Sequence, residues 1–408
     1  MQNFKSIFSK KNLKPIINFG KMPLGNGFVS NKEKKEYQFN LKIGFNEKLK
    51  LVQLFDYPDP KRMFNKNYAF LSSTSNSMKS HFQKYANQLK KKINKKKFSI
   101  LEIGCNDGIL LKNFKKNHHL GVEPSENVCK IARKNGLNVI NKFFNRGLLN
   151  EKKISKKFDI ICGANVFCHI PDLNEMFFTL SKFLNKNGII AIEEPYLGDM
   201  IKKTSYDQIY DEHIFIFSII SINLIASYFN LEVFDAEHQK THGGSMRYYL
   251  SQKNQKKKSK RLQYLINNEK KLGLDNFKKL KIFKKKCFIS KKKLKNKINK
   301  ISKKYEIYGY GATSKSTTVL NFCKINNKII KGIFDTSYTK IGKFTPITHI
   351  PILDYKKKYK EIKPKVCILF AWNHSIEICK KENAFLKNGM RFITHIDKKF
   401  LQDKKFFI

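Results

Sequence analysis

The stretch Phe98-Ser-Ile-Leu-Glu-Ile-Gly-Cys-Asn-Asp-Gly108 decides the fold of this chain. Its residues 100–103 form a short, mostly apolar run, which predicts a buried strand. Gly104 and Gly108 follow where a strand would turn into a helix, and apolar residues recur at helical spacing over 109–114. Glycine lets the backbone adopt strained angles and lets a ligand come close, while a helix start offers free N–H groups. The stretch therefore predicts a strand, a glycine turn and a helix.

A second strand is predicted over residues 120–123, and it ends in Glu123, about 20 residues after the first glycine. At this spacing an acid reaches the ribose hydroxyls of a nucleotide bound to a βαβ unit. The third glycine of a dinucleotide turn is missing, and Glu102-x-Gly104-x-x-x-Gly108 instead resembles the S-adenosylmethionine (SAM) loop of class I methyltransferases. The glycine pair alone also fits an ordinary strand-to-helix turn. With the acid added, we predict a SAM site formed by Glu102, Gly104, Cys105, Asn106, Gly108, Glu123 and Asn165.

Composition bounds the class of protein. The 408 residues suffice for two or three domains, and 41% hydrophobic with 13% aromatic residues fits globular folding. The formal net charge of +50 suggests nucleic acid as a partner, but only six of the 82 basic residues are arginine. Base-reading and phosphate-clamping surfaces favour arginine, and the lysines here are spread along the whole chain. We therefore expect no nucleic-acid partner.

The cysteines and the apolar segments predict the compartment. Eight cysteines occur without a Cys-x-x-Cys pair, which indicates a reducing compartment. Residues 1–20 lack the apolar core of a signal peptide. The longest apolar stretch, 215–229, is interrupted by polar residues and is too short to span a bilayer. The expectation is a soluble, cytoplasmic protein without a membrane partner.

We predict four regions: 1–85, 86–250, 251–303 and 304–408. The first is a small domain with strands near 16–20 and 49–55 and a helix over 76–96. The cap of that helix is Ser75, Asn76 or Ser77. The second region is an α/β domain, since strands alternate with helical patterns and predict a doubly wound parallel sheet. Its ligands are expected at the carboxyl ends of the strands, near Asn106, Glu123, Asn165, His169, Glu193 and Glu194.

The last two regions have simpler patterns. Residues 251–303 are saturated with lysine and carry apolar residues at helical intervals, which predicts a helical connector. A nucleic-acid or membrane surface is the alternative for this segment. Residues 304–408 predict a second Rossmann-like α/β unit, with a strand entering a turn at Gly309 and Gly311 and a helix capped at 313–314. Two glycines are a weak sign of a second nucleotide site.

A possible catalytic group follows the fifth predicted strand of the central sheet. His213 comes directly after Glu212, and Tyr210 lies three residues before it. Histidine is the side chain best suited to move a proton near neutral pH, and a tyrosine or carboxylate can orient it. Taken alone, this pattern favours a structural histidine over a catalytic one.

In combination, several segments resemble the sugar C-methyltransferases, three-domain enzymes that act on nucleotide-linked keto-deoxysugars. The matching segments are 19–28, 51–54, 72–75, 210–218, 242–247, 308–321 and 371–373. The resemblance implies that a base removes a proton next to a sugar ketone and that the enolate carbon attacks the SAM methyl group. His213 then corresponds to the base, with Tyr210 and Glu212 as its partners, and Tyr68 closes over the site. His169 corresponds to a group near the enolate oxygen, with strand-end packing as the alternative.

The same resemblance implies a substrate-binding surface in the carboxy-terminal half. Its residues are His242, Gly243, Arg247, Gly309, Gly311, Lys315 and Asn321. Lys315 and its glycine loop are expected to hold the nucleotide diphosphate rather than a second cofactor. Two other hypotheses remain: a methyltransferase with a different small-molecule acceptor, and a non-catalytic, nucleic-acid-associated protein.

One feature departs from the family. Its first domain usually carries two Cys-x-x-Cys pairs that bind zinc. Here the second pair would fall near Asn46 and Leu49, and the chain has no cysteine before Cys105. We therefore expect no metal site, and a first domain held together by packing.

Overall fold

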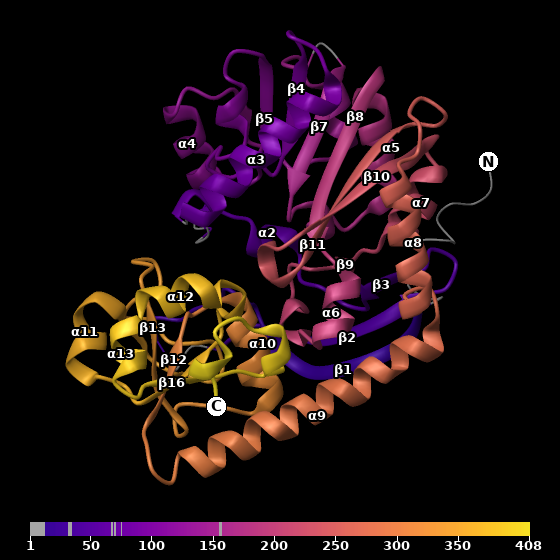
Figure 1. The fold of residues 1–408 in the computed structure, drawn as a ribbon. Helices are drawn as coiled ribbons and strands as arrows, with labels where there is room; N and C mark the ends of the chain where they lie inside the picture. Colours follow the sequence, from indigo (N-terminus) through magenta and orange to yellow (C-terminus); the bar gives the residue numbers. More distant parts are fainter. Residues whose placement is uncertain (1–12, 32–34, 67, 69–70, 75, 155–156) are drawn as a thin grey trace.

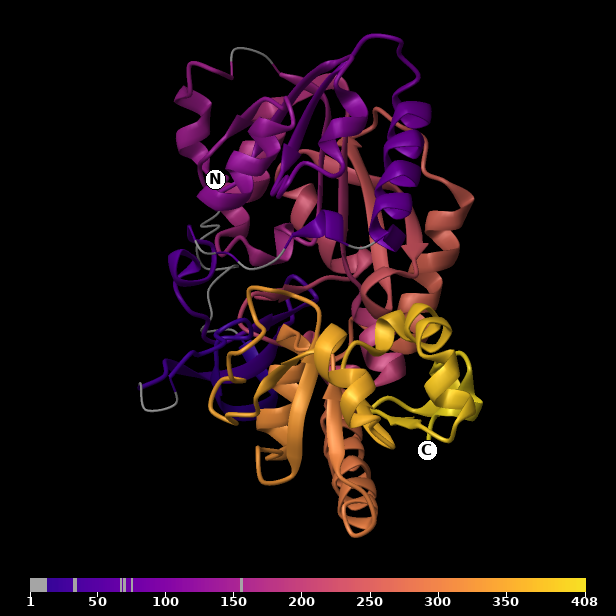
Figure 2. The same cartoon turned by 90° about the vertical axis from the view of Figure 1, so that its left-hand side faces the viewer.

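The computed structural model describes residues 13–31, 35–66, 68, 71–74, 76–154 and 157–408. Ser75, one of the three predicted helix caps, lies outside these residues. The described strands form sheets of four, seven and five strands. In Figure 1 the seven-stranded sheet lies at the top, the five-stranded sheet at the lower left and the four-stranded sheet at the lower right. Figure 2 shows the long helix α9 (Phe277–Ile301) extending downward from this assembly.

The four-stranded sheet is antiparallel in the order β1-β2-β3-β9. Its strands are β1 (Leu13–Pro23), β2 (Gln38–Asn46), β3 (Leu51–Leu54) and β9 (Phe215–Ile216). β1 and β3 confirm the two predicted strands. The sequence prediction missed β2, although Phe39, Leu41 and Ile43 alternate with polar residues in the pattern of a half-buried strand. β9 comes from a segment between two strands of the seven-stranded sheet, so distant parts of the chain share this sheet.

Asn46 holds the turn between β2 and β3, where the family would place zinc ligands. Its side-chain Oδ1 accepts the backbone N–H groups of Lys48 and Leu49, at 3.0 and 3.1 Å. The strands around it bury Ile43 and Phe45 completely. The turn is therefore held by an asparagine side chain over a packed apolar core. The predicted absence of a metal here stays a prediction.

The seven-stranded sheet has the order β10-β11-β8-β7-β4-β5-β6. Its strands are β4 (Ser99–Ile103), β5 (His118–Val122), β6 (Val139–Ile140), β7 (Phe158–Ala164), β8 (Leu184–Pro195), β10 (Leu231–Gln239) and β11 (Ser245–Gln252). The first five are parallel, and β11 runs antiparallel to both of its neighbours. The predicted class I methyltransferase architecture, a Rossmann-like doubly wound sheet, is confirmed.

Helices cover both faces of this sheet. They are α3 (Asn76–Ile93), α4 (Glu126–Lys134), α5 (Leu173–Phe183) and α7 (Ile219–Ser227). Ile100 packs with α3, while the next residue, Leu101, belongs to the core shared with α5 and α7, as the period of two along a strand requires. The helix predicted over 109–114 is instead a short 3₁₀ turn, Leu111–Phe114. Only three residues separate its end from β5, so a longer helix has no room.

The five-stranded sheet is parallel throughout, in the order β14-β13-β12-β15-β16. Its strands are β12 (Ile307–Tyr310), β13 (Ile330–Asp335), β14 (Ile352–Asp354), β15 (Val366–Leu369) and β16 (Arg391–Ile393). Its helices are α10 (Ser314–Cys323), α11 (Tyr355–Ile362), α12 (Ser375–Lys381) and α13 (Asn383–Lys387). The strand order reverses between β12 and β15, which is where ligands bind in such sheets. The second Rossmann-like unit is confirmed.

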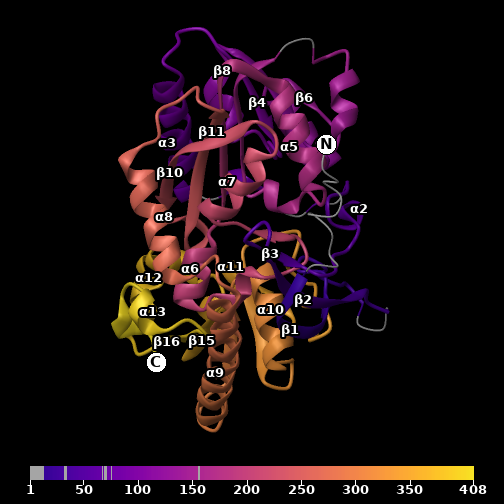
Figure 3. The same ribbon diagram turned by 90° about the vertical axis from the view of Figure 1, so that its right-hand side faces the viewer.

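The predicted connector consists of α8 (Lys260–Leu272) and α9. α9 lies between β1 and the end of the five-stranded sheet (Figure 3), and its Ser290 hydroxyl donates to the carbonyl oxygen of His395 at 2.8 Å. One apolar cluster includes Ile16, Ile190 and Ile333, so it runs through all three sheets. Among the described residues, none of the helices combines the length and apolarity needed to cross a membrane. The four predicted region boundaries stay predictions.

Candidate functional site

A cavity of about 690 Å³ lies at the carboxyl ends of the central strands and is also lined by the first region and the five-stranded sheet. All five predicted catalytic residues line it: Tyr68, His169, Tyr210, Glu212 and His213. Four predicted cofactor residues line it: Gly104, Asn106, Glu123 and Asn165. Two predicted substrate residues line it: His242 and Lys315. The volume lies within the range of about 300–1,000 Å³ typical of ligand sites.

Glu123, at the end of β5, organises the glycine turn. Its Oε2 accepts the backbone N–H of Asn106 at 3.0 Å, and its Oε1 accepts that of Ser125 at 2.8 Å. Burial raises the pKa of Glu123, against the lowering effect of these two N–H groups. Each carboxylate oxygen keeps a second acceptor site. The side chain can therefore still accept a ribose hydroxyl from the cavity side, which fits SAM.

The turn itself is shaped for close approach. Gly104 has a φ of 62°, and a Cβ atom there would overlap the side chain of Val166. The serine-rich turn of the first region lies over it: the backbone N–H groups of Ser72 and Ser73 donate to the side chains of Asn106 and Asp107, each at 3.0 Å. These N–H groups are therefore already bound to an amide oxygen and a carboxylate oxygen of the chain itself.

Three predicted cofactor residues lie behind the cavity wall, which corrects their assignment. Glu102 and Cys105 are buried, and burial raises the pKa of both. Gly108 has a φ of 82°, and a Cβ there would overlap the side chain of Leu137. These residues support the turn from the core side. Asn165 does line the cavity, and its Oδ1 has no hydrogen-bond partner among the described residues.

His213 is held at both ring nitrogens. Nδ1 lies 2.7 Å from the carbonyl oxygen of Gln208, and because a carbonyl only accepts, Nδ1 carries the proton. Nε2 then accepts the hydroxyl proton of Tyr210 at 2.7 Å. Burial and the neighbouring His169 lower the pKa of His213 well below its usual range. The ring is therefore neutral at pH 7, with a lone pair on Nε2.

Aromatic rings stack along this wall of the cavity. Phe64 stacks on His169 with centroids 5.4 Å apart, and His169 stacks on His213 at 5.5 Å. The Tyr210 ring is tilted by 36° against His213, with centroids 4.0 Å apart. Burial lowers the pKa of His169 to about 3, and its Nε2 has no hydrogen-bond partner among the described residues. Tyr68 lies beyond Phe64, with ring centroids 5.4 Å apart. Phe64 was missed because one aromatic residue among 35 phenylalanines carries no sequence signal.

Cys168, His169 and His213 place nitrogen and sulfur atoms within 4.8 Å of one another. Such a group can hold a metal ion, but both nitrogens of His213 are already engaged in hydrogen bonds. The two hydrogen bonds fix the orientation of the His213 ring, which stacks on His169.

The residues before His213 connect it to the first region. The carboxylate of Asp211 accepts the backbone N–H of Gly25 at 2.9 Å, and Glu212 accepts the side-chain amide of Asn26 at 2.9 Å. Burial raises the pKa of both acids, and the Asp211 charge adds to the effect on Glu212. Glu212 and Asn26 both line the cavity.

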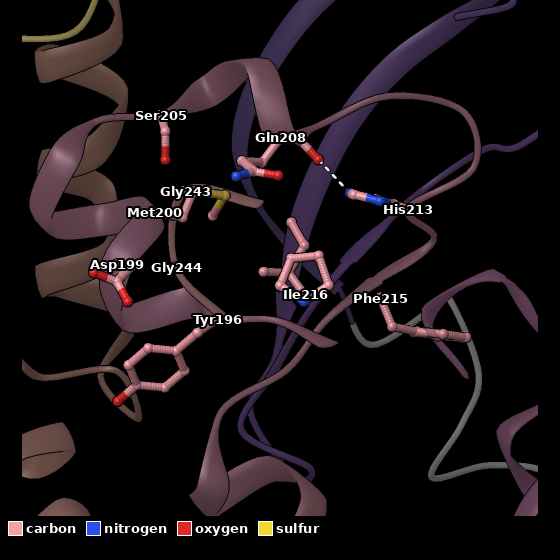
Figure 4. A pocket seen from close by; sticks show the side chains of 11 residues that line it. Tyr196, Asp199, Met200, Ser205, Gln208, His213, Phe215, Ile216, Gly243 and Gly244 are labelled. Carbon is pink, nitrogen blue, oxygen red and sulfur yellow. Dashed lines mark hydrogen bonds between the residues drawn. The ribbon is translucent and has the colours of Figure 1, made fainter. Parts of the chain in front are cut away.

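His213 also borders a second, much smaller chamber (Figure 4) of about 10 Å³. Ser205, Gln208 and the glycine pair at 243–244 contribute to its wall. This volume is too small for a substrate. The chamber therefore marks the inner side of His213, and the large cavity its reactive side.

Two lysines of the carboxy-terminal unit reach the cavity, the buried Lys315 and the half-buried Lys340. Lys315 Nζ lies 3.2 Å from the carbonyl oxygen of His242 and 3.4 Å from Oδ1 of Asn373. Lys340 Nζ donates to the carbonyl oxygen of Ala312 at 2.8 Å. Burial lowers the pKa of Lys315 to about 8 and also lowers that of Lys340. The sequence could not single out Lys340 because lysine is so abundant here.

Arg247 is a correction to the predicted substrate residues. It is 1% exposed, pairs with Glu193 with an Nε–Oε2 distance of 2.8 Å, and stacks on the ring of Tyr85. Glu193 also contacts His81 at 2.6 Å. The guanidinium group is thus enclosed between α3 and the sheet, where it has no access to a ligand.

Four further predicted substrate residues do not line the large cavity. Gly243 borders the small chamber, and Asn321 donates to the carbonyl oxygen of Thr317 within its own helix. A Cβ at Gly309 would crowd Ile333, and Gly311 adopts a φ of 87° in the turn. Gly309 and Gly311 therefore shape the turn before α10 and its packing.

The comparisons with known proteins match both α/β units. Residues 74–236 match the family model of a methyltransferase domain. Residues 240–397 match the family model described as a C-methyltransferase C-terminal domain.

C-methyltransferase NovU of Streptomyces niveus is 25% identical over 391 residues, covering 93% of this chain and 92% of its own. An ubiquinone biosynthesis O-methyltransferase of Pelagibacter ubique (strain HTCC1062) is 30% identical over 103 residues, covering 24% of this chain and 42% of its own.

Similar solved structures include a SAM-dependent methyltransferase of Clostridium acetobutylicum, with 14% identity, a TM-score of 0.34, and coverage of 42% of this chain and 92% of that one. Magnesium protoporphyrin IX methyltransferase of Synechocystis with bound SAM has 12% identity, a TM-score of 0.32, and coverage of 42% and 78%. Both domain models match in chain order and a C-methyltransferase aligns over nearly the full length, and together these matches support a SAM-dependent C-methyltransferase.

Proposed function

We propose that the enzyme transfers a methyl group to a carbon next to the ketone of a nucleotide-linked deoxysugar. One observation carries the proposal: a single cavity joins the Glu123 turn, the His213–Tyr210 pair and two lysines, Lys315 and Lys340. SAM supplies an electrophilic methyl group. A carbon acceptor needs a base to remove its proton, and a nucleotide diphosphate needs cations, so each end of the cavity matches one part of this reaction.

His213 is the base in this proposal. Its neutral state and its protonated Nδ1 leave Nε2 as the proton acceptor. The Tyr210 hydroxyl now donates to Nε2, so a substrate carbon that approaches this nitrogen displaces it. The released hydroxyl can then donate to the oxygen of the forming enolate, where charge develops. His169, stacked beside the base, limits water access on the other face.

Lys315 and Lys340 hold the diphosphate in this proposal. Lys315 is buried and Lys340 half-buried, and desolvation lowers the pKa of both, so their attraction for a phosphate is stronger than in water. Thr313 and Ser314, at the start of α10, line the same end of the cavity. The eight cysteines are all free, which supports a reducing, cytoplasmic location.

Mass spectrometry of reactions with SAM and a panel of nucleotide-linked 4-keto-deoxysugars tests the reaction. We expect one added methyl group with the wild type and none with His213→Asn. The control is His118→Asn, an exposed histidine at the start of β5, which should keep full activity. SAM affinity of each variant is measured by calorimetry. A wild type that binds SAM but methylates none of the sugars would point to a different acceptor.

Lys315→Ala tests the substrate end. We expect the KM for the nucleotide sugar to rise about tenfold or more, because a buried charged hydrogen bond contributes about 1.5–3 kcal/mol. SAM affinity should stay unchanged, since Glu123 and the glycine turn are intact. If SAM affinity falls together with sugar affinity, the assignment of Lys315 to the diphosphate is wrong.

A further inference from the structure

The carbonyl group that fixes the tautomer of His213 belongs to a short turn gripped by the five-stranded sheet. Gln208 ends the 3₁₀ turn η6 (Tyr206–Gln208), which follows α6 (Leu197–Lys203). Its carbonyl oxygen is the partner of His213 Nδ1, drawn as a dashed line in Figure 4. The residues on both sides of Gln208 are bound by groups from the carboxy-terminal unit.

Asp207 is bound from one side. It is fully buried, and its Oδ2 accepts the indole N–H of Trp372 at 2.7 Å. Its Oδ1 lies 3.0 Å from Nε2 of His395, at an angle poor for a hydrogen bond, so this contact is mainly electrostatic. Burial raises the pKa of Asp207, but His395, Lys315 and Trp372 together lower it below its usual value. Trp372 follows β15 and His395 follows β16, so two adjacent strand ends hold one carboxylate.

Ile209 is bound from the other side. Its carbonyl oxygen accepts the hydroxyl proton of Thr318 at 2.9 Å, and Thr318 belongs to α10. Both Thr318 and Ile209 are buried, so water cannot replace this bond. Asp207 and Ile209 are therefore bound by groups from three elements of the carboxy-terminal unit. The carbonyl group of Gln208 lies between these two bound residues.

We propose that Asp207 and Thr318 are positioning residues, through which the carboxy-terminal unit sets the tautomer and the orientation of His213. The proposal rests on His213 being the base. Neutral imidazole has two tautomers, and the one with the proton on Nε2 cannot accept a proton at that atom. A displaced Gln208 carbonyl would remove the acceptor that selects the Nδ1–H tautomer. The carboxy-terminal unit thus contributes to the chemical step as well as to substrate binding.

Two conservative variants test this. Thr318→Val removes the hydroxyl and keeps the shape, and Trp372→Phe removes the indole N–H. The matched control is Thr179→Val, which removes a buried hydroxyl that donates to the carbonyl oxygen of Glu175 at 2.8 Å, within α5. Protein labelled with ¹⁵N at its ten histidines reports each ring tautomer by NMR, and His213→Asn assigns the signal.

In the wild type and in Thr179→Val we expect Nδ1 protonated and Nε2 unprotonated at His213. In Thr318→Val and Trp372→Phe we expect a mixture of tautomers. Their kcat should fall about 10- to 100-fold, because only part of the about 100- to 10,000-fold contribution of general-base catalysis is lost. The KM for the sugar and the affinity for SAM should change less than twofold, and SAM affinity also confirms folding.

A wild-type tautomer signal with unchanged kcat in both variants would overturn the proposal, as would a rise in KM with kcat preserved. The tautomer signal needs no substrate. It therefore still decides the positioning role if the wild type methylates no sugar in the panel, an outcome that would reject the proposed function instead.

Discussion

The chain contains two glycine turns built on the same plan. In the central sheet, Glu123 at the end of β5 accepts the N–H groups of Asn106 and Ser125. In the five-stranded sheet, Asp335 at the end of β13 accepts the N–H groups of Ala312 and Ser337, at 2.7 and 2.8 Å. In each case an acid at the end of the second strand closes the turn that follows the first.

The two turns differ in what occupies the space beyond them. The first is followed by a 3₁₀ turn, and its acid lines the large cavity. The second leads directly into α10, and Lys340 donates to its Ala312 carbonyl. The glycine-and-acid pattern thus specifies a turn, and the two turns differ because Glu123 lines the large cavity whereas Asp335 does not. The Gly309 and Gly311 pattern is explained by the turn itself.

Replacing the two acids should give the largest contrast. Glu123→Ala should weaken SAM binding about 100-fold, because a carboxylate hydrogen bond to a ligand contributes up to about 3 kcal/mol. Asp335→Ala removes the equivalent turn bonds and should leave SAM affinity unchanged. Calorimetric titration of both variants with SAM measures this. Equal losses in the two variants would mean that Glu123 acts only by closing its turn.

Replacing a glycine in each turn sharpens the same contrast. Gly104→Ala forces a positive φ on alanine and overlaps Val166, so SAM affinity should fall about tenfold along with stability. Gly309→Ala crowds Ile333 and Phe370 and should lower the free energy of unfolding by about 1–3 kcal/mol. Its SAM affinity should be that of the wild type. Urea unfolding and SAM titration separate the two effects, and a SAM defect in Gly309→Ala would contradict this account.

Local signals made much of the fold predictable. The apolar run over residues 100–103 lies within β4, Ser99–Ile103, and Thr313 caps α10 as the sequence indicates. The predicted catalytic residues Tyr210, Glu212 and His213 line the same cavity, because one short loop carries all three. Short-range patterns are reliable where neighbours in sequence determine the structure.

Residues whose role depends on distant contacts were not predictable. Arg247 looks like a ligand for phosphate, but its partner Glu193 lies 54 positions away in the chain, on a neighbouring strand. Lys340 becomes important only because its loop folds over the cavity. The 3₁₀ turn after Gly108 follows from the early start of β5, which apolar spacing does not report.

The pH dependence of substrate binding distinguishes the cationic end of the cavity from the SAM end. Lys315 has its pKa lowered to about 8, so it is charged below pH 8 and loses its charge as the pH rises through 8. The value of kcat/KM for the sugar should therefore fall by up to about tenfold per pH unit above pH 8. Lys315→Arg keeps its charge and should move this fall to higher pH. If the pH profile of kcat/KM is the same in Lys315→Arg as in the wild type, a group other than Lys315 causes the fall above pH 8.

The smallest expected effect concerns how two helices near these turns begin, α10 after the second turn and α4 after Glu123. Thr313 caps α10 in a reciprocal pair with Ser316, whereas the side chain of Ser125 makes no cap bond at the start of α4. Thr313→Ala should lower the free energy of unfolding by about 1 kcal/mol and Ser125→Ala by less than about 0.5 kcal/mol. Ser218→Ala, at the matching capping box of α7, is the control and should cost as much as Thr313→Ala. Urea unfolding of the three variants measures these losses. Equal losses at Thr313 and Ser125 would show that the side-chain caps do not contribute to stability, and that Glu123 and Asp335 alone stabilise these two regions.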